Sequence, residues 1–393
     1  MRSVEEFCAA YGVDRRNSDC VKWDRVEERF GAGGLLPMWV ADMDFKIPEA
    51  AQKAMIDRVH HGAFGYGGIP ASYYEALFGW MSARHGVELD PGWIRFSTGV
   101  VNSFYWTVQA FTKPGDAVIV CSPVYYPFYH AVEDNGRLLV RSELINTEGE
   151  YTMDFDDFEA QIVARRVKLF IHCSPHNPVG RVWTEEELRR TFEICAKHGV
   201  IVVSDEIHLD FARPGTEFVS ALKLKPHYPN LIVLHSASKT FNLAGLLHSH
   251  LIIPDERLRE VYDAHAKQVN KAAASVMGLI AAEACYREGG EWLDGLRSLI
   301  EHNYGLLKSE FEVRLPQAVL SEKEGTYLAW LDLRKCAAAD QVRALVQDKC
   351  GLAVDYGEWF GEKSQGFIRI NLATLPEHIR FAAGQISKHF SIF

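Results

Sequence analysis

The chain has 393 residues, of which 48% are hydrophobic and 24% are charged, a composition typical of soluble globular proteins with two or three domains. Its formal net charge of −10 argues against nucleic-acid binding, because a protein that neutralises phosphates needs a basic face. The start of the chain lacks the pattern of a signal peptide and we find no apolar stretch of membrane-spanning length, so we expect a cytoplasmic enzyme that acts on a small molecule.

The first 48 residues lack a regular alternation of strands and helices, and we expect them to pack against the last part of the chain. Residues 49–285 contain short apolar runs bounded by turn residues. Continuous apolarity predicts strands that are buried on both faces of a parallel sheet. The runs are AVIVCS at 117–122, KLFIHC at 168–173, VIVVS at 200–204, LIVLH at 231–235 and LII at 251–253.

Between these runs lie helix-like segments, of which TEEELRRTFEICAKHG at 184–199 is the clearest. Thr184 and Glu187 form a capping box at its start, and Gly199 ends it. The alternation of strand and helix predicts a doubly wound α/β fold with a mostly parallel sheet, and such sheets bind ligands at the carboxyl ends of their strands.

Residues 286–393 have a different pattern, with long helical stretches followed by the strand-like segments TYLAWLDL and GFIRINLA. We interpret this region as a second, smaller α+β domain. The absence of a low-complexity linker predicts that the two domains are tightly associated.

Neither cysteine nor histidine spacing indicates a metal site. The eight cysteines contain no CxxC pair, which in a chain of this length is typical of reduced, buried thiols. The sixteen histidines contain no HExxH motif. We therefore expect no metal ion.

Four polar features follow predicted strands or lie at the ends of elements. Asp205 ends a buried strand, where a carboxylate needs a cation or a hydrogen-bond donor. Asn177 lies in the turn SPHNPVG, Lys239 lies among hydroxyls in SASKT, and Gly99 precedes a helix-like stretch that could bind a phosphate. Taken singly, each feature also fits a cap, a turn or a solvated loop. Their order along an α/β chain favours a shared site.

These motifs and their order resemble the pyridoxal-phosphate enzymes of fold type I, the aspartate-aminotransferase superfamily, from about residue 20 to the C-terminus. The matching segments are GVV at 99–101, SPVYYPF at 122–128, NPVG at 177–180, DEIH at 205–208, SASK at 236–239 and RIN at 369–371. A second set resembles the cystathionine β-lyase branch of MalY/PatB type: VKWD at 21–24, PMWVADMDF at 37–45 and FGYGGIP at 64–70.

The resemblance implies that pyridoxal 5′-phosphate is the cofactor. Lys239 would bind it as an imine and then act as the base at the substrate's Cα, while Asp205 would pair with the ring nitrogen. Asn177 would donate to the ring hydroxyl and Tyr125 would stack on the ring. The phosphate would be bound by backbone and side chains of Gly99, Val100, Val101, Ser236 and Ser238, with Tyr66 of the partner subunit in a homodimer.

The resemblance also implies a site for the substrate carboxylate. Arg369 would bind it bidentately, which suits a planar guanidinium, with help from Asn177. The segment around Val40 and Ala41 would close over the same group. Without the surrounding motifs, Arg369 would be interpreted as a structural ion-pair partner and Tyr125 as part of an aromatic cluster with Tyr126 and Tyr129.

Two positions depart from the pattern of many aminotransferases. His208 stands where many relatives have a tyrosine that donates to the ring hydroxyl, and Leu247 stands where many have a phosphate-binding arginine. His208 is included in the predicted cofactor site, although a capping or packing role is the alternative. Both departures resemble the lyase branch.

We therefore predict a β-elimination that releases a thiol, pyruvate and ammonia from cystathionine or a related cysteine S-conjugate. Amino transfer begins with the same steps and uses the same Lys239, Asp205 and Asn177, so a class I/II aminotransferase is the first alternative. A regulatory protein that keeps the fold and the cofactor is the second.

Overall fold

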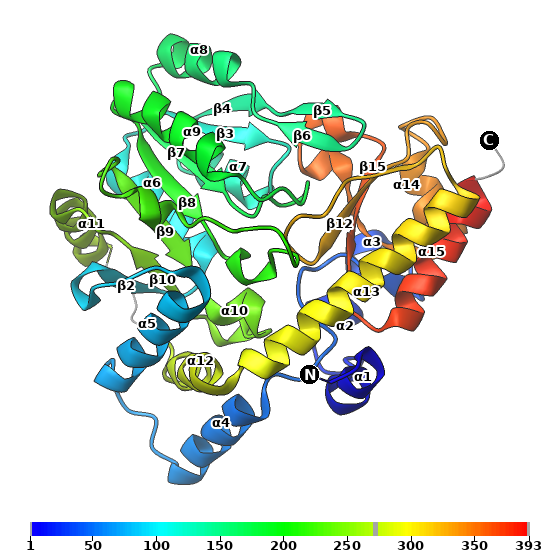
Figure 1. The fold of residues 1–393 in the computed structure, drawn as a ribbon, viewed down its shortest axis with the longest axis horizontal. Helices are drawn as coiled ribbons and strands as arrows, with labels where there is room; N and C mark the ends of the chain where they lie inside the picture. The colour runs from blue at the N-terminus through cyan, green and yellow to red at the C-terminus, as the bar shows by residue number, and fades with distance from the viewer. Residues whose placement is uncertain (1, 270–273, 391–393) are drawn as a thin grey trace.

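Seven strands form the central sheet of the computed structural model, which describes residues 2–269 and 274–390 (Figure 1). Their order across the sheet is β2-β10-β9-β8-β7-β3-β4. Neighbours from β9 to β4 run parallel, and β10 is antiparallel to both β9 and β2. The strands are β2 (Ile94–Ser97), β3 (Ala117–Ser122), β4 (Leu138–Glu143), β7 (Leu169–Cys173), β8 (Ile201–Asp205), β9 (Leu231–His235) and β10 (Ser249–Ile252).

This architecture confirms the predicted fold class and most of the predicted strands. The prediction of a parallel strand at 251–253 is wrong in direction, because β10 pairs antiparallel on both sides. All four of its residues are buried, and a strand buried on both faces favours apolar residues, such as Leu251 and Ile252 here, whichever way it runs. Apolarity alone therefore could not give its direction.

Side chains of alternate strand residues enter two separate cores, one on each face of the sheet. Val118 and Val120 of β3 pack with α6 (Val100–Phe111), α7 (Pro127–Glu133) and α11 (Glu256–Gln268). Ile119, between them, packs on the opposite face with α5 (Ala71–His85), α8 (Phe155–Arg165), α9 (Glu185–Lys197) and α12 (Val276–Glu288). Helix α9 begins with the predicted Thr184–Glu187 capping box.

A second sheet, with the order β11-β12-β15-β14, is antiparallel throughout. Two long helices, α13 (Gly290–Arg314) and α15 (Pro376–Phe390), lie side by side next to it (Figure 1). The strands are β11 (Val319–Leu320), β12 (Leu328–Asp332), β14 (Asp355–Tyr356) and β15 (Phe367–Asn371). The predicted strand-like segments TYLAWLDL and GFIRINLA thus supply the central pair, β12 and β15.

Several of the remaining elements belong to the first part of the chain. Strand β1 (Leu36–Pro37) pairs in parallel with β13 (Leu352–Ala353), and α1 (Val4–Tyr11) packs on α13. The N-terminal part therefore contacts the C-terminal part. The others are α2 (Val21–Asp24), α3 (Val26–Phe30), α4 (Glu49–His61), α10 (Ala237–Thr240), α14 (Val342–Ala344), and the hairpin of β5 (Ile145–Thr147) and β6 (Glu150–Thr152). None of the helices formed by the described residues is long and apolar enough to cross a membrane.

Residues 37–45, which we call the strap, run from β1 across to the central sheet. A buried ion pair fixes its end: Lys22 Nζ lies 2.8 Å from Asp44 Oδ2, and the two side chains are 0% and 2% exposed. Trp23 Nε1 and Thr374 Oγ1 also donate to the Asp44 carboxylate, at 2.8 and 2.7 Å. Burial alone would raise the pKa of Asp44, but Lys22 and these donors hold that pKa below its usual value.

Replacing Lys22 with methionine should destabilise the protein, because it removes the buried cation 2.8 Å from the Asp44 carboxylate and leaves only the more distant Arg15, at 3.9 Å, among the described residues. Breaking such a pair costs about 3 kcal/mol or more of unfolding free energy, which urea denaturation can measure. Lys53→Met is the matched control, since Lys53 pairs with Asp57 on the surface and should change little. Equal effects of the two substitutions would contradict the anchoring role of Lys22.

Candidate active site

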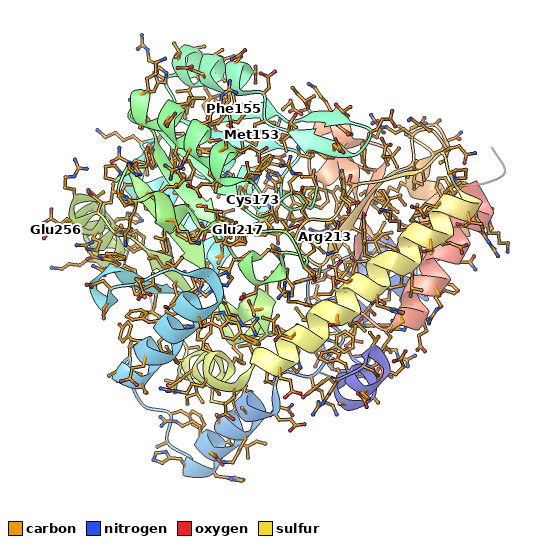
Figure 2. The ribbon with its side chains drawn as sticks, in the orientation of Figure 1. Met153, Phe155, Cys173, Arg213, Glu217 and Glu256 are labelled. Carbon is orange, nitrogen blue, oxygen red and sulfur yellow. The ribbon has the colours of Figure 1, made fainter. Side chains whose placement is uncertain are left out.

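A cavity of about 230 Å³ lies at the carboxyl ends of β7, β8 and β9. Figure 2 labels Cys173, the last residue of β7, which lines it. Ten of the predicted site residues also line this cavity: Ala41, Gly99, Val100, Val101, Tyr125, Asn177, Asp205, His208, Ser238 and Lys239. Four others do not, namely Val40, Tyr66, Ser236 and Arg369. Groups that are far apart in the sequence therefore meet where an α/β sheet is expected to bind its ligand.

Lys239 lies in the short helix α10, directly after β9. Ser236 caps this helix by accepting from Ser238 N–H at 3.0 Å, and its own hydroxyl donates to the His248 carbonyl at 2.6 Å. Lys239 Nζ donates to the Ala41 carbonyl of the strap at 2.6 Å. Burial lowers the pKa of Lys239 to about 8, so an appreciable fraction of the amine is neutral near pH 7. A neutral amine is the form that attacks a carbonyl.

Asp205 ends β8 with its carboxylate 5% exposed. Its Oδ1 accepts from Ile207 N–H at 3.0 Å. Burial raises the pKa of Asp205 to about 7, although the Ile207 amide and Lys239 oppose the rise. A cationic group in the cavity beside Asp205 would favour the ionised carboxylate. The site is thus suited to a ring nitrogen that carries a proton.

Asn177 connects the cavity to Arg369, which lies behind it. Arg369 Nη1 donates to Asn177 Oδ1 at 2.9 Å, and Nη2 donates to the Trp39 carbonyl of the strap at 3.1 Å. Nη2 also contacts the Asp355 carboxylate. The predicted carboxylate-binding arginine is therefore next to the cavity, but it is buried and already has three acceptors.

The N-terminus of α6 forms one wall of the cavity. Gly99 precedes this helix with a φ of +143°, a conformation that favours glycine. Its own N–H donates to Ser249 Oγ at 3.1 Å, so the backbone N–H groups of the residues that follow are the ones that can hold an anion. Among the described residues that line the cavity, Lys239 is the one lysine or arginine.

Two histidines that line the cavity are neutral. Burial lowers the pKa of His208 well below its usual value and the pKa of His248 to about 3. His208 packs edge-on against Tyr327 with ring centroids 5.4 Å apart. Among the described residues, Nδ1 of His208 and Nδ1 of His248 are both buried without a hydrogen-bond partner, whereas His248 Nε2 contacts Tyr73 Oη at 2.5 Å.

Sequence reasoning missed several residues of the site. Tyr327 donates to the Ala41 carbonyl at 2.7 Å, the same oxygen that Lys239 contacts. Asp355 reaches Arg369 because the two residues face each other across β14 and β15. Neither lies in a motif, so only the pairing of distant segments brings them to the site. The lining residues Thr98, Asn102, Phe104, Cys173, Ile207 and Ala244 were also missed, although each lies within five residues of a predicted one.

Tyr66 is fully exposed within one chain. A role for it at the cavity of a partner subunit stays a prediction.

No group of three or more histidine, cysteine, aspartate or glutamate side chains suited to a metal ion occurs within residues 2–269 and 274–390.

Two other proteins show what this chain is similar to in sequence and in structure. The protein named cystathionine beta-lyase PatB, from Bacillus subtilis (strain 168), is 41% identical over 375 residues, which cover 93% of this chain and 96% of PatB. The crystal structure of cystalysin from Treponema denticola, which contains a pyridoxal 5′-phosphate cofactor, superimposes with a TM-score of 0.92 at 34% identity. The match covers 96% of this chain and 97% of cystalysin.

A more distant relative and a family-wide profile extend the comparison. Protein MalY from Escherichia coli (strain K12) is 31% identical over 370 residues, 91% of this chain and 92% of MalY. The profile described as aminotransferase class I and II matches residues 36–385, which include both sheets, the strap and the cavity. The chain belongs to the aminotransferase class I and II family.

Proposed function

We propose that this protein is a pyridoxal-phosphate-dependent carbon–sulfur β-lyase. Its substrate is cystathionine or a related cysteine S-conjugate, and its products are a thiol, pyruvate and ammonia. The observation that carries the proposal is the 41% identity, over nearly the whole chain, to the protein named cystathionine beta-lyase PatB. Amino transfer is the alternative that the family leaves open.

The residues at the cavity fit pyridoxal phosphate. Lys239 supplies the amine for a covalent link and Asp205 supplies a buried carboxylate whose raised pKa leaves it in need of a cation. The start of α6 offers backbone N–H groups and a favourable helix end for a phosphate. Tyr125, whose ring lines the cavity, is placed to pack against a planar ligand.

Held by Lys239 and Asp205, pyridoxal phosphate would supply an electron sink that makes the substrate's Cα proton removable. Asp205 would supply the carboxylate that keeps the ring nitrogen protonated. Lys239 Nζ, with its lowered pKa, accepts the Cα proton. Arg369 and Asn177 hold the substrate carboxylate and so orient the Cα–H bond toward Lys239. The thiolate then leaves from Cβ.

We also propose that the enzyme is a cytoplasmic homodimer with its sites at the subunit interface. Each of the eight cysteines is a free thiol, which fits a reducing compartment. Tyr66 and Phe64 are exposed in a segment without helix or strand, and Leu247 is 55% exposed although it lines the cavity. Exposed apolar side chains, one of them at the cavity itself, fit a surface that a second subunit covers.

Incubation with L-cystathionine or an S-alkyl cysteine should release pyruvate and free thiol in equal amounts, because elimination produces both from one substrate molecule. Pyruvate can be followed with a coupled reductase and thiol with a chromogenic disulfide. Lys239→Ala should abolish turnover while circular dichroism shows an intact fold. Keto-acid-dependent amino transfer faster than thiol release would instead favour the aminotransferase.

Asp205→Asn should lower turnover by roughly 100-fold or more, since a neutral amide cannot hold a proton on the ring nitrogen. The matched control is Glu206→Gln. Glu206 is buried next to Asp205, with a pKa also raised by burial to about 7, but it bonds Ser220 and Ala221 and does not line the cavity. Steady-state kinetics should separate the two variants. Equal losses would mean that burial, and not the ring nitrogen, explains the need for Asp205.

Mixing two defective variants tests the shared site. Tyr66→Ala should be impaired and Lys239→Ala inactive. After the two are unfolded and refolded together, hybrid dimers should regain activity, because a Lys239 site of one chain then receives Tyr66 of the other. Mixtures that stay as inactive as the separate variants, in a protein that ultracentrifugation shows to be dimeric, would place Tyr66 outside the partner's site.

A further inference from the structure

Arg369 is neutralised inside the protein by Asp355. The two residues face each other across β14 and β15, and they are 2% and 1% exposed. Arg369 Nη2 contacts Asp355 Oδ2, whereas the other acceptors of the guanidinium, the Asn177 amide and the Trp39 carbonyl, carry no charge. Among the described residues, Asp355 is therefore the one charged group that accepts a hydrogen bond from Arg369. A substrate carboxylate that binds Arg369 competes with it.

Both members of this pair have an unused polar atom. Arg369 Nε and Asp355 Oδ1 are buried, and neither has a hydrogen-bond partner within residues 2–269 and 274–390. Buried polar atoms are rarely left unpaired in proteins, because each costs free energy. The guanidinium therefore retains a donor for one more acceptor, and the carboxylate retains an oxygen on which a proton can sit.

We propose that Asp355 is an internal counterion that takes up a proton when the carboxylate of an amino-acid substrate binds Arg369. The inference rests on the proposed function, in which Arg369 receives that carboxylate. Two ionised carboxylates on one buried guanidinium repel each other, and a proton on one of them removes the repulsion. The proton comes from solvent, binds Asp355, and returns to solvent when the ligand leaves.

The groups around Asp355 determine its pKa. Arg369 on β15 and Arg29 on α3 face it as cations, and Tyr125 and Tyr126 face it from the start of α7. Burial raises the pKa of Asp355 to about 6, against the effect of the two arginines. Asp355 is then mostly ionised at pH 7 in the free site. An added carboxylate raises its pKa further, so ligand binding should strengthen as the pH falls toward 6.

Titration calorimetry of the holoenzyme with propionate tests the proposal. Propionate carries the carboxylate but has no amine that could react with the cofactor. At pH 7, measurements in buffers of different ionisation enthalpy should show uptake of close to one proton per bound propionate in the wild type. Asp355→Asn should show almost none, and its affinity should vary little between pH 6 and pH 8.

Asp332→Asn is the matched control, because Asp332 is a buried carboxylate of the same sheet that pairs with Arg334 away from the cavity. It should behave as the wild type. No proton uptake by the wild type, no binding of propionate, or equal uptake by Asp355→Asn would each overturn the proposal. The wild-type measurement decides even where the variant fails to fold. The calorimetric measurement does not depend on thiol release. A wrong lyase assignment would be seen separately, in the assay of pyruvate and thiol.

Discussion

Strands β7, β8 and β9 are covered by helices on both faces, and this enclosure decides where polar chemistry can occur in the protein. Within these strands almost every side chain is buried, and an ionised group there would have no partner. At their carboxyl ends the chain leaves the sheet, and Asp205 and the short helix with Lys239 follow at once. The reactive groups lie close together because the sheet permits them only at this edge.

The site also depends on contacts between parts of the chain that are distant in sequence. The strap bonds to neighbouring backbone near its two ends, where Met38 N–H donates to the Ala353 carbonyl and Asp44 N–H to the Ala373 carbonyl, and asparagine side chains add further bonds. Asn371 donates to the carbonyls of Val40 and Asp42, and Asn242 donates to those of Met43 and Phe45. Because Asn371 belongs to the second sheet and Asn242 follows α10, the strap joins the two halves of the site.

The strands in which nearly every residue is buried could be predicted from the sequence. Strands β3, β7, β8 and β9 read as apolar runs, and Asp205, Asn177 and Lys239 were recognisable because each follows such a run. The edge strands β2 and β4 were missed, since several of their residues are partly exposed. Tyr327, His248 and Asp355 could not be predicted, because they reach the site through strand pairing and packing that no local pattern encodes.

The Ala41 carbonyl accepts from both Lys239 Nζ and Tyr327 Oη, as the two lone pairs of a carbonyl oxygen allow. A lysine engaged in covalent chemistry gives up its hydrogen bond to that oxygen, but the tyrosine does not. Under the proposed function, the strap would keep its bond to Tyr327 when Lys239 gives up its own. The position of the strap would then not depend on the bonding state of the lysine, because Tyr327 holds the Ala41 carbonyl in either case.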